Sequence, residues 1–403
     1  MPPRQVANEE LVERLGRSPE WMFQRSGIRF RHVVESGVTS GDLAVAAGRE
    51  ALARSAVGDV AAVVVATTSP DRPCPGIAPS VASRLGMAGV AALDVQAVCA
   101  GFVYGLSVAQ GLIAAGTADS VLVIGTDALS LLVAPDDPTS MLFGDGAGAV
   151  VLRSGHCDEP GALGPFVLGS DGAGRDLITV RGGGSEERSR VGGTPADPYL
   201  RLDGQEVFWR AVEHMTSASR AALDAAEWKP QDVDRIVPHQ ANARIISMLA
   251  ERLGISAGSA LSNIEQVGNT SAASIPILLD HANRAGDLKP GHRVLLTAFG
   301  GGLAWGATTL VWPHLARPHQ LIRRNGMYDI LVSILTDKFQ VRPGLVAPEA
   351  TPVALGLDSL FVVELSLVLE GDPGLRISFD ELSEANTLAE IAQLMQDKHN
   401  ASV

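Results

Sequence analysis

Several features are scarce in this 403-residue sequence, and each shortage excludes a class of protein. The three cysteines, Cys74, Cys99 and Cys157, show no CxxC spacing and no close pairing, so neither a disulfide framework nor a zinc site is indicated. No apolar run is long enough to span a bilayer, and residues 1–10 are polar, without the apolar core of a signal peptide. We therefore expect a cytoplasmic protein that makes no use of a membrane or a bound metal.

Positive charge is also in short supply. The chain has 32 Lys and Arg against 45 Asp and Glu, a formal net charge of -13, which argues against nucleic acid as a partner. The imbalance is uneven, because residues 325–403 carry twelve acidic and only four basic side chains. This predicts a separate acidic domain over 327–400. The preceding residues 314–326 are basic, contain Pro318 and show no period, which predicts a linker.

The first 313 residues contain an internal repeat. An apolar strand near residues 59–67 leads to a helix ending near Arg84, and a similar strand near 232–239 leads to a helix ending near Arg252. Two such halves, over 1–160 and 161–313, predict a layered α/β protein with buried sheets. The second half opens with a strand at 166–172 that has no counterpart in the first half, so the first strand is expected to be missing.

Cys99 stands at the most informative position. An apolar, strand-like run over 91–95 leads to the cysteine, and a long helical stretch over 100–115 follows it. A sulfur at a helix N-terminus lies at the positive end of the helix dipole, which favours thiolate over thiol. A small buried hydrophobe is the ordinary role of a lone cysteine. Here the strand-to-helix junction predicts a nucleophile.

Two further segments supply polar groups at similar junctions. His239 stands at the end of an apolar strand, and Asn269 stands in a loop of small residues before another helix. Neutral His and Asn side chains donate hydrogen bonds to the oxygen of a thioester or its enolate. We therefore expect Cys99, His239 and Asn269 to form one site. The glycine-rich segment 143–149 lacks the GxGxxG spacing and precedes a strand, so no nucleotide redox cofactor is expected.

Five motifs, in this order, resemble 3-oxoacyl-acyl-carrier-protein synthase III of the thiolase fold. They are Asp-Val-Gln-Ala-Val-Cys-Ala-Gly-Phe at 94–102, Phe-Gly-Asp-Gly-Ala-Gly-Ala at 143–149, Val-Pro-His-Gln-Ala-Asn at 237–242, Gly-Asn-Thr-Ser-Ala-Ala-Ser at 268–274 and Ala-Phe-Gly-Gly-Gly at 298–302. The resemblance spans roughly residues 5–313. It implies a thiolase-like, five-layered αβαβα body made of two pseudo-repeated halves.

The resemblance also implies a reaction. Cys99 takes an acyl group from a thioester, a malonyl thioester loses carbon dioxide, and the resulting carbanion attacks the acyl-cysteine to give a 3-oxoacyl thioester. His239 and Asn269 hold the malonyl thioester oxygen during this step. The backbone N–H groups of Cys99 and Gly301 form the oxyanion hole, and Phe299 disfavours the malonyl carboxylate.

Other family features concern substrate delivery and assembly. Trp21 and Arg25 match a segment that holds coenzyme A, whereas Asp137 stands where the family has a stacking Arg, which puts priming from coenzyme A in question. The family forms homodimers through the strand near Val95. Cys74 occupies a position where a bulky Phe closes the partner's acyl tunnel, so we expect a deeper substrate pocket.

The acidic C-terminal region resembles an acyl carrier protein, a small helical bundle. Asp358-Ser359-Leu360 precedes an apolar helix and matches the phosphopantetheine attachment motif, so Ser359 is expected to carry 4'-phosphopantetheine, added by a phosphopantetheinyl transferase. An Asp-Ser-Leu triplet alone is as often a helix cap. Basic residues at the tunnel mouth, with Arg244, Arg210 and Arg252 as candidates, are expected to dock the acidic carrier.

We therefore predict a condensing enzyme fused to its own carrier, using acyl-coenzyme A or acyl-carrier and malonyl-carrier thioesters to start fatty acid or polyketide synthesis. Three alternatives stay open. The first is an acyltransferase that moves an acyl group from Cys99 to a carrier or small acceptor without decarboxylation. The second is a non-catalytic docking module, and the third is a hydrolytic or thiolase-type enzyme, which requires a second cysteine near the glycines.

Overall fold

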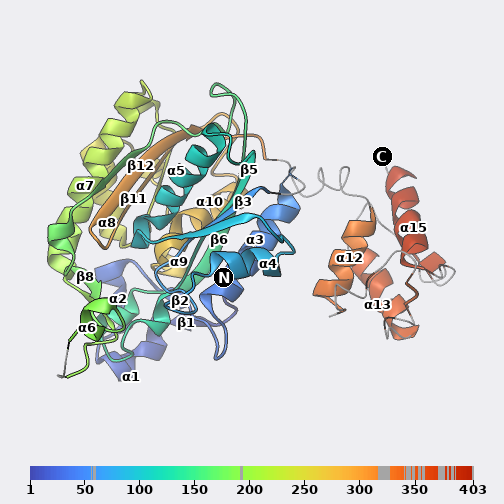
Figure 1. The fold of residues 1–403 in the computed structure, drawn as a ribbon, viewed down its shortest axis with the longest axis horizontal. Helices are drawn as coiled ribbons and strands as arrows, with labels where there is room; N and C mark the ends of the chain where they lie inside the picture. The colour runs from blue at the N-terminus through green and yellow to red at the C-terminus, as the bar shows by residue number, and fades with distance from the viewer. Residues whose placement is uncertain are drawn as a thin grey trace. The chain divides into compact units, whose positions relative to one another are not determined.

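The chain divides into two compact units, Met1–Leu315 and Ala316–Val403, shown in Figure 1. The computed structural model describes residues 1–55, 57, 60–190, 194–315, 327–339, 341, 346, 350–352, 355, 359–370, 377–378, 381–382, 385 and 387–401. Most of the predicted linker at 314–326 lies outside these residues. Among the described residues, no helix combines the length and apolarity needed to cross a membrane.

The first unit contains two four-stranded sheets. The first has the order β4 (Ala91–Val95), β3 (Ala62–Ala66), β5 (Ser120–Ala128) and β6 (Asp145–Arg153), with only β6 antiparallel to its neighbour. The second has the order β10 (Arg235–Pro238), β11 (Arg293–Gly300), β12 (Ala304–Val311) and β7 (Val167–Ser170). The trio β10, β11 and β12 repeats the directions of β3, β5 and β6. The sheets therefore carry the predicted internal repeat.

Apolar side chains alternate along the central strands, so both faces of each sheet are covered. Val64 and Val123 pack against α5 (Gly101–Ala114) and α10 (Ser274–Ala285), which also contact the second sheet. Val63 and Val65 face α3 (Ser40–Arg54) and α4 (Ala78–Arg84). Outside the second sheet lie α7 (Gly204–Ala225) and α8 (Ala243–Leu253). This arrangement confirms the five-layered αβαβα fold, in which buried sheets need helices on both faces.

Shorter elements surround these layers. The remaining strands form two pairs, β1 (Gln5–Ala7) with β2 (Phe30–His32) and β8 (Ile178–Val180) with β9 (Leu200–Leu202). The short helices of the first unit are α1 (Val12–Leu15), α2 (Pro19–Ser26), α6 (Ser185–Arg188) and α9 (Ile264–Val267). The N-terminal segment thus contains a strand, but this strand pairs with β2 and not with the first sheet.

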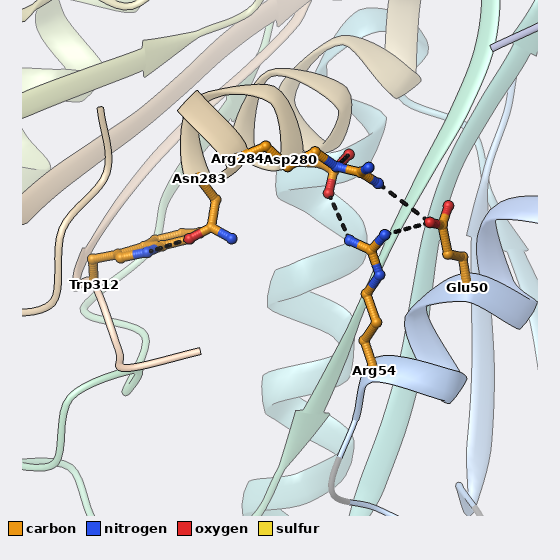
Figure 2. Close-up of polar contacts among 6 residues, drawn as sticks. All are labelled: Glu50, Arg54, Asp280, Asn283, Arg284 and Trp312. Carbon is orange, nitrogen blue, oxygen red and sulfur yellow. Dashed lines mark hydrogen bonds and ion pairs between the residues drawn. The ribbon is translucent and has the colours of Figure 1, made fainter. Parts of the chain in front are cut away.

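One edge of the first sheet differs from its counterpart in the second. β7 pairs with β12, whereas no described strand pairs with the free edge of β6. A groove of about 420 Å³ runs there between α3 and α10. Arg54 on α3 reaches Asp280 on α10 at 3.2 Å, and Arg284 on α10 reaches Glu50 on α3 at 3.2 Å, as Figure 2 shows. These exposed pairs join the two helices, although each contributes little stability.

The second unit is a small helical bundle. Its helices are α12 (Met327–Asp337), α13 (Ser359–Glu370) and α15 (Leu388–Ala401). The fully buried side chains at its centre include Leu331 on α12, Leu365 on α13 and Met395 on α15. The three predicted helices are therefore present and share one core, separate from the cores of the first unit.

This core predicts how the second unit responds to mutation. Leu365 is 1% exposed, so Leu365→Ala should lower the stability of residues 327–401 by roughly 2–5 kcal/mol. The first unit should keep its stability, because its cores share no residue with this one. Hydrogen exchange on the full chain, read separately for peptides of the two units, measures both effects.

Val363→Ala is the matched control, because Val363 lies on the same helix with 38% of its surface exposed. Its exchange should stay close to that of the unmodified chain. Equal effects of the two substitutions would contradict this description of the core.

Candidate active site

Cys99 lies where the sequence predicts it, at the junction between β4 and α5. It belongs to a short 3-10 turn, η2 (Val98–Ala100), and is 8% exposed. Val98 just before it has a φ of 48°, a strained value for a β-branched residue, and strain of this kind gathers at functional sites. A Cβ on Gly300 would lie 2.6 Å from the Cys99 nitrogen, so β11 can approach the nucleophile only because residue 300 is glycine.

The protonation state of Cys99 corrects the expectation of a thiolate. Burial raises the pKa of the Cys99 thiol to about 12; the Ser271 hydroxyl lowers it and the Asp127 carboxylate raises it further. A helix dipole is worth roughly 0.3–1 kcal/mol at an exposed site, which is small against the cost of burying a charged sulfur. The helix dipole is therefore too weak to offset burial, and Cys99 is a thiol instead of the predicted thiolate.

His239 follows β10 directly and is 2% exposed. Burial lowers the pKa of its imidazole to about 3, so the ring is neutral at physiological pH. Its Nδ1 lies 2.7 Å from the Ser274 Oγ, which also accepts a hydrogen bond from the Gln240 N–H. The buried Ser274 proton then has Nδ1 as its acceptor, and the imidazole proton must reside on Nε2. His239 is thus a neutral donor through Nε2.

Asn269 is held by its backbone and by one side-chain atom. Its N–H donates to the Leu142 carbonyl at 2.8 Å, and its own carbonyl accepts from the Gly144 N–H at 3.0 Å. The side-chain Oδ1 accepts from the Ser271 N–H at 2.9 Å. With Oδ1 occupied in this way, the Asn269 Nδ2 group is left as a donor.

The turn from residue 269 to residue 274 brings these groups together. Its 3-10 segment, η8 (Ser271–Ala273), packs against η2, which carries Cys99. Ser271 contacts the thiol of Cys99, and Ser274 contacts His239. The structure therefore gathers the three predicted residues around one buried turn, which starts at Asn269 itself.

The contacts recorded for the other two residues expected near the nucleophile are to other neighbours. A Cβ on Gly301 would meet Ile178, whereas the preceding Gly300 faces the Cys99 backbone. Phe299 is 3% exposed and packs toward α7, where its ring stacks on His214 at 6.0 Å. The proposed roles of Gly301 and Phe299 therefore stay predictions.

In the segment expected to hold coenzyme A, two arginine side chains lie over the Trp21 ring. The guanidinium groups of Arg17 and Arg25 each lie 5.2 Å from the Trp21 ring centre. Asp137 caps the 3-10 turn η4 (Pro138–Met141) and pairs with Arg201 at 2.9 Å. Arg201 also pairs with Asp197, so its single positive charge offsets only part of the negative charge by which we expected Asp137 to repel a phosphate.

The three candidate docking residues are not equivalent. Arg244 is exposed at the start of α8 and donates to the Gln24 carbonyl of α2 at 2.7 Å. Arg252 lies at the other end of the same helix, about 12 Å further along it. Arg210 on α7 pairs with Glu206 at 2.9 Å. Of the three, Arg244 alone joins the helix that carries Trp21.

Two further predicted residues, Cys74 and Ser359, belong to other segments of the sequence. Cys74 is exposed in a loop beside β4, where a Cβ on Gly76 would lie 2.7 Å from the Asp94 carboxyl group. Ser359 is the first residue of the twelve-residue helix α13. The neighbouring Asp358, expected to take part in docking, lies outside the described residues.

Sequence reasoning missed several residues that shape the site. Ser271 and Ser274 belong to the Gly-Asn-Thr-Ser-Ala-Ala-Ser motif at 268–274, in which Asn269 alone was predicted to be functional. Asp127 is a lone carboxylate in an apolar strand, a sequence pattern that indicates a buried charge. In the structure it is fully buried beside the turn. Among the described residues, no group of three or more His, Cys, Asp or Glu side chains is placed to hold a metal ion.

The raised pKa of Cys99 predicts its reactivity. Because only the thiolate is alkylated, iodoacetamide should modify Cys99 slowly at pH 7, and the rate should rise about tenfold per pH unit to at least pH 9. Intact-mass spectrometry of a Cys74→Ser, Cys157→Ser variant follows this one thiol. In denaturant the rate should level off near pH 8.5, the ordinary pKa of cysteine. A plateau below pH 8 in the folded protein would contradict the burial argument.

Comparison with known proteins places both units in families. Residues 93–172 match the profile of 3-oxoacyl-[acyl-carrier-protein (ACP)] synthase III, residues 223–312 match its C-terminal profile, and residues 329–395 match the phosphopantetheine attachment site. The chain is 53% identical over 317 residues to beta-ketoacyl-[acyl-carrier-protein] synthase III 3 of Streptomyces coelicolor, which covers 78% of this chain and 95% of the relative.

Solved structures agree with these matches. The 3-oxoacyl-(acyl carrier protein) synthase III of Pseudomonas aeruginosa PAO1 superimposes with a TM-score of 0.75 at 45% identity, over 79% of this chain and 97% of that one. The priming beta-ketosynthase of the R1128 polyketide pathway gives 0.72 at 35% identity, over 78% and 94%. The chain belongs to the 3-oxoacyl-[acyl-carrier-protein] synthase III family, and it carries a phosphopantetheine attachment domain after the synthase.

Proposed function

We propose that this chain condenses an acyl group held on Cys99 with a malonyl thioester, releasing carbon dioxide and forming a 3-oxoacyl thioester. The observation that carries the proposal is the turn at residues 269–274. It occupies the Asn269 Oδ1 and the His239 Nδ1, so each side chain keeps one donor, Nδ2 and Nε2. Two neutral donors held by one turn suit an oxygen that gains negative charge during a reaction.

The first step is a transfer between sulfurs. The Cys99 sulfur attacks the carbonyl carbon of an acyl thioester, the old carbon–sulfur bond breaks, and the thiol proton ends on the departing thiol. Because the proton passes from one thiol to the other, the raised pKa of Cys99 does not prevent this exchange. The proposed oxyanion hole, the N–H groups of Cys99 and Gly301, stabilises the intermediate oxygen.

The second step forms the carbon–carbon bond. When the malonyl carboxylate leaves as carbon dioxide, its bonding electrons move toward the thioester oxygen, where His239 and Asn269 donate. The carbanion then attacks the acyl-cysteine carbonyl, and the Cys99–carbon bond breaks. The released sulfur takes up a proton and regenerates the thiol. A His239 that is already neutral, with its pKa near 3, needs no proton change to act as donor.

The second unit supplies a carrier for these substrates. Its family indicates covalent 4'-phosphopantetheine, whose terminal thiol carries acyl groups as thioesters. We assign the attachment to Ser359. A serine at the start of α13 fits a phosphodiester, because the free N–H groups and the dipole of a helix N-terminus favour negative charge. A phosphopantetheinyl transferase would be the partner that installs the group.

The region around Trp21 bears on which thioester donates the starter acyl group. Because Asp137 pairs with Arg201, coenzyme A thioesters remain acceptable substrates beside acyl-carrier ones. A fused carrier, together with the likeness to a priming ketosynthase of a polyketide pathway, supports a role in starting polyketide rather than fatty acid chains. In the enzyme classification this activity is that of an acyltransferase. The cytoplasmic location stays a prediction.

We also propose a homodimer. β4 pairs with β3 alone, and its Leu93 is 36% exposed. An exposed apolar edge strand is a template for pairing with a second copy. The loop with Cys74 lies beside this edge, so in a dimer Cys74 would be close to the partner's substrate pocket.

The alternatives fit the site less well. Simple acyl transfer from Cys99 needs an oxyanion hole but not the paired donors of His239 and Asn269. A thiolase-type reaction needs a second cysteine at the site, yet Cys74 and Cys157 are both exposed. A docking module alone would not require the buried Cys99.

The proposed roles predict that substitutions at the three residues impair different steps, either acylation of Cys99 or decarboxylation of the malonyl thioester. Cys99→Ala should abolish the acyl-enzyme. His239→Ala and Asn269→Ala should leave acylation of Cys99 within a few-fold of normal and reduce carbon dioxide release from the malonyl thioester by roughly 100-fold or more, the cost of a lost oxyanion donor. Intact mass follows acylation, and gas release follows decarboxylation.

His281→Ala is the control, because His281 is an exposed histidine on α10 whose ring bonds the Asn263 side chain. Normal condensation by the His239 or Asn269 variant would favour the acyltransferase alternative.

The assignment of Ser359 predicts a second result. Ser359→Ala should end product formation from substrates delivered on the fused carrier. A free carrier should restore it only in part and with stronger salt dependence, because the tether supplies roughly millimolar effective concentration. Arg244→Ala should weaken the free carrier further, by about 1 kcal/mol or less.

Ser378→Ala serves as the matched control, since Ser378 is another serine of the same unit and its hydroxyl donates to Glu381 at 2.9 Å. Loading of phosphopantetheine onto the Ser359→Ala chain, seen as a mass increase, would disprove the assignment.

A further inference from the structure

A buried carboxylate outside the proposed reaction lies next to the site. Asp127 is near the end of β5 and is 0% exposed. Its Oδ1 accepts hydrogen bonds from the Thr68 N–H at 2.7 Å and from the Ser69 N–H and hydroxyl at 3.0 and 2.9 Å. The Thr67 hydroxyl donates to the same oxygen at 3.1 Å. These donors follow β3, so they belong to the first half of the synthase.

The other oxygen faces the second half. The Ala272 N–H donates to the Asp127 Oδ2 at 3.2 Å. Ala272 belongs to η8, the same turn whose Ser271 N–H holds Asn269 and which leads to Ser274. The strand approaches this turn closely, because a Cβ on Gly125 would lie 2.2 Å from the Ala272 carbonyl oxygen. Asp127 and Gly125 thus share a face of β5 that presses on the turn.

The donors around Asp127 match an ionised carboxylate. Burial raises the pKa of Asp127 above its ordinary value, and the nearby Ser271 hydroxyl together with hydrogen bonds from Thr68, Ala272 and Ser69 opposes that rise. The Thr67 and Ser69 hydroxyls already accept from the Ser69 and Ala128 N–H groups, so their protons point to Asp127. Since N–H groups can only donate, the ionised form satisfies every one of these contacts.

Asp127 also acts on the nucleophile. Its negative charge adds to burial in raising the pKa of Cys99. The Ser271 hydroxyl interacts with both groups and lowers both pKa values, yet it completes no full hydrogen bond to either. Other titratable groups belong to the surrounding elements, and among them Asp94 on β4 accepts from the Ile77 and Ala78 N–H groups. His239 is neutral, and the Tyr104 hydroxyl of α5 donates to the Gly169 carbonyl at 2.9 Å. Asp127 is therefore the charged group that the thiol senses.

We propose that Asp127 is a positioning residue for the condensation: its carboxylate clamps the turn that presents Asn269 and Ser274 against the segment after β3. This inference rests on the proposed function, since it concerns the same site. Asp127 touches no reacting atom in this account. It acts through the Ala272 N–H group, and its charge adds to burial in raising the pKa of Cys99.

Asp127→Asn tests the proposal, because the amide has the same shape but places an N–H group against a donor. Acylation of Cys99 should stay within a few-fold of normal. Carbon dioxide release should fall roughly 10- to 100-fold in kcat, the effect of small misplacement of catalytic groups, with little change in KM. The pH midpoint of Cys99 alkylation should move down by about one unit, because a nearby negative charge is lost.

Asp145→Asn is the matched control. Asp145 is also 0% exposed and accepts from the Val34 N–H and from the Ser130 N–H and hydroxyl, none of which belongs to the turn. It should lose comparable stability and leave both the alkylation midpoint and the decarboxylation rate close to normal. Equal effects of the two variants, or an unmoved midpoint in Asp127→Asn, would overturn the proposal.

Ser271→Ala provides an independent arm if Asp127→Asn does not fold. Loss of the Ser271 hydroxyl should move the alkylation midpoint upward, the opposite direction, because that hydroxyl lowers the pKa of Cys99. A downward shift or no shift would contradict the proposed arrangement. If His239→Ala retains full condensation, the proposed function fails, whereas loss in His239→Ala without loss in Asp127→Asn refutes only the clamp.

Discussion

The site depends on a polar turn that is buried and must find all its hydrogen-bond partners inside the protein. Ser271, Ala272 and Ser274 are each at most 1% exposed. An unpartnered buried polar group costs about 1–3 kcal/mol, so the hydrogen bonds that the turn does make stabilise this geometry, although the Thr270 and Ser271 hydroxyls complete none. The Asn269 Oδ1, the His239 Nδ1 and the Asp127 carboxylate supply that geometry. The donors left over, Nδ2 and Nε2, are thereby aimed by the folding of the turn.

The two halves of the synthase meet at this turn. Asp127 belongs to the first sheet, and the turn opens α10, which packs between the sheets. The two repeated halves therefore supply different parts of the site. The first half contributes Cys99 and the Asp127 carboxylate, and the second contributes His239 and Asn269. Close approach is possible because Gly125 and Gly300 have no side chains, so strands of both sheets reach the catalytic segments.

Much of this arrangement could be predicted from the sequence, and the failures have physical causes. The periodicity and the family motifs predicted the layers, the carrier bundle and the residues Cys99, His239 and Asn269, because local patterns record which faces are buried. The thiolate expectation was wrong because the pKa of Cys99 depends on burial by distant segments, which a local motif does not show. Asp127 was missed for the same reason, since its partners Thr68 and Ala272 are far from it in the sequence.

The central claim is that Cys99, His239 and Asn269 perform a decarboxylative condensation that feeds the fused carrier. Intact-mass analysis of the full chain, with a malonyl group loaded on its phosphopantetheine thiol before an acyl thioester is added, tests it most directly. The account predicts a 3-oxoacyl mass on the carrier unit, with one carbon dioxide released for each adduct. An acyl mass transferred unchanged to the carrier, with no carbon dioxide released, would contradict it.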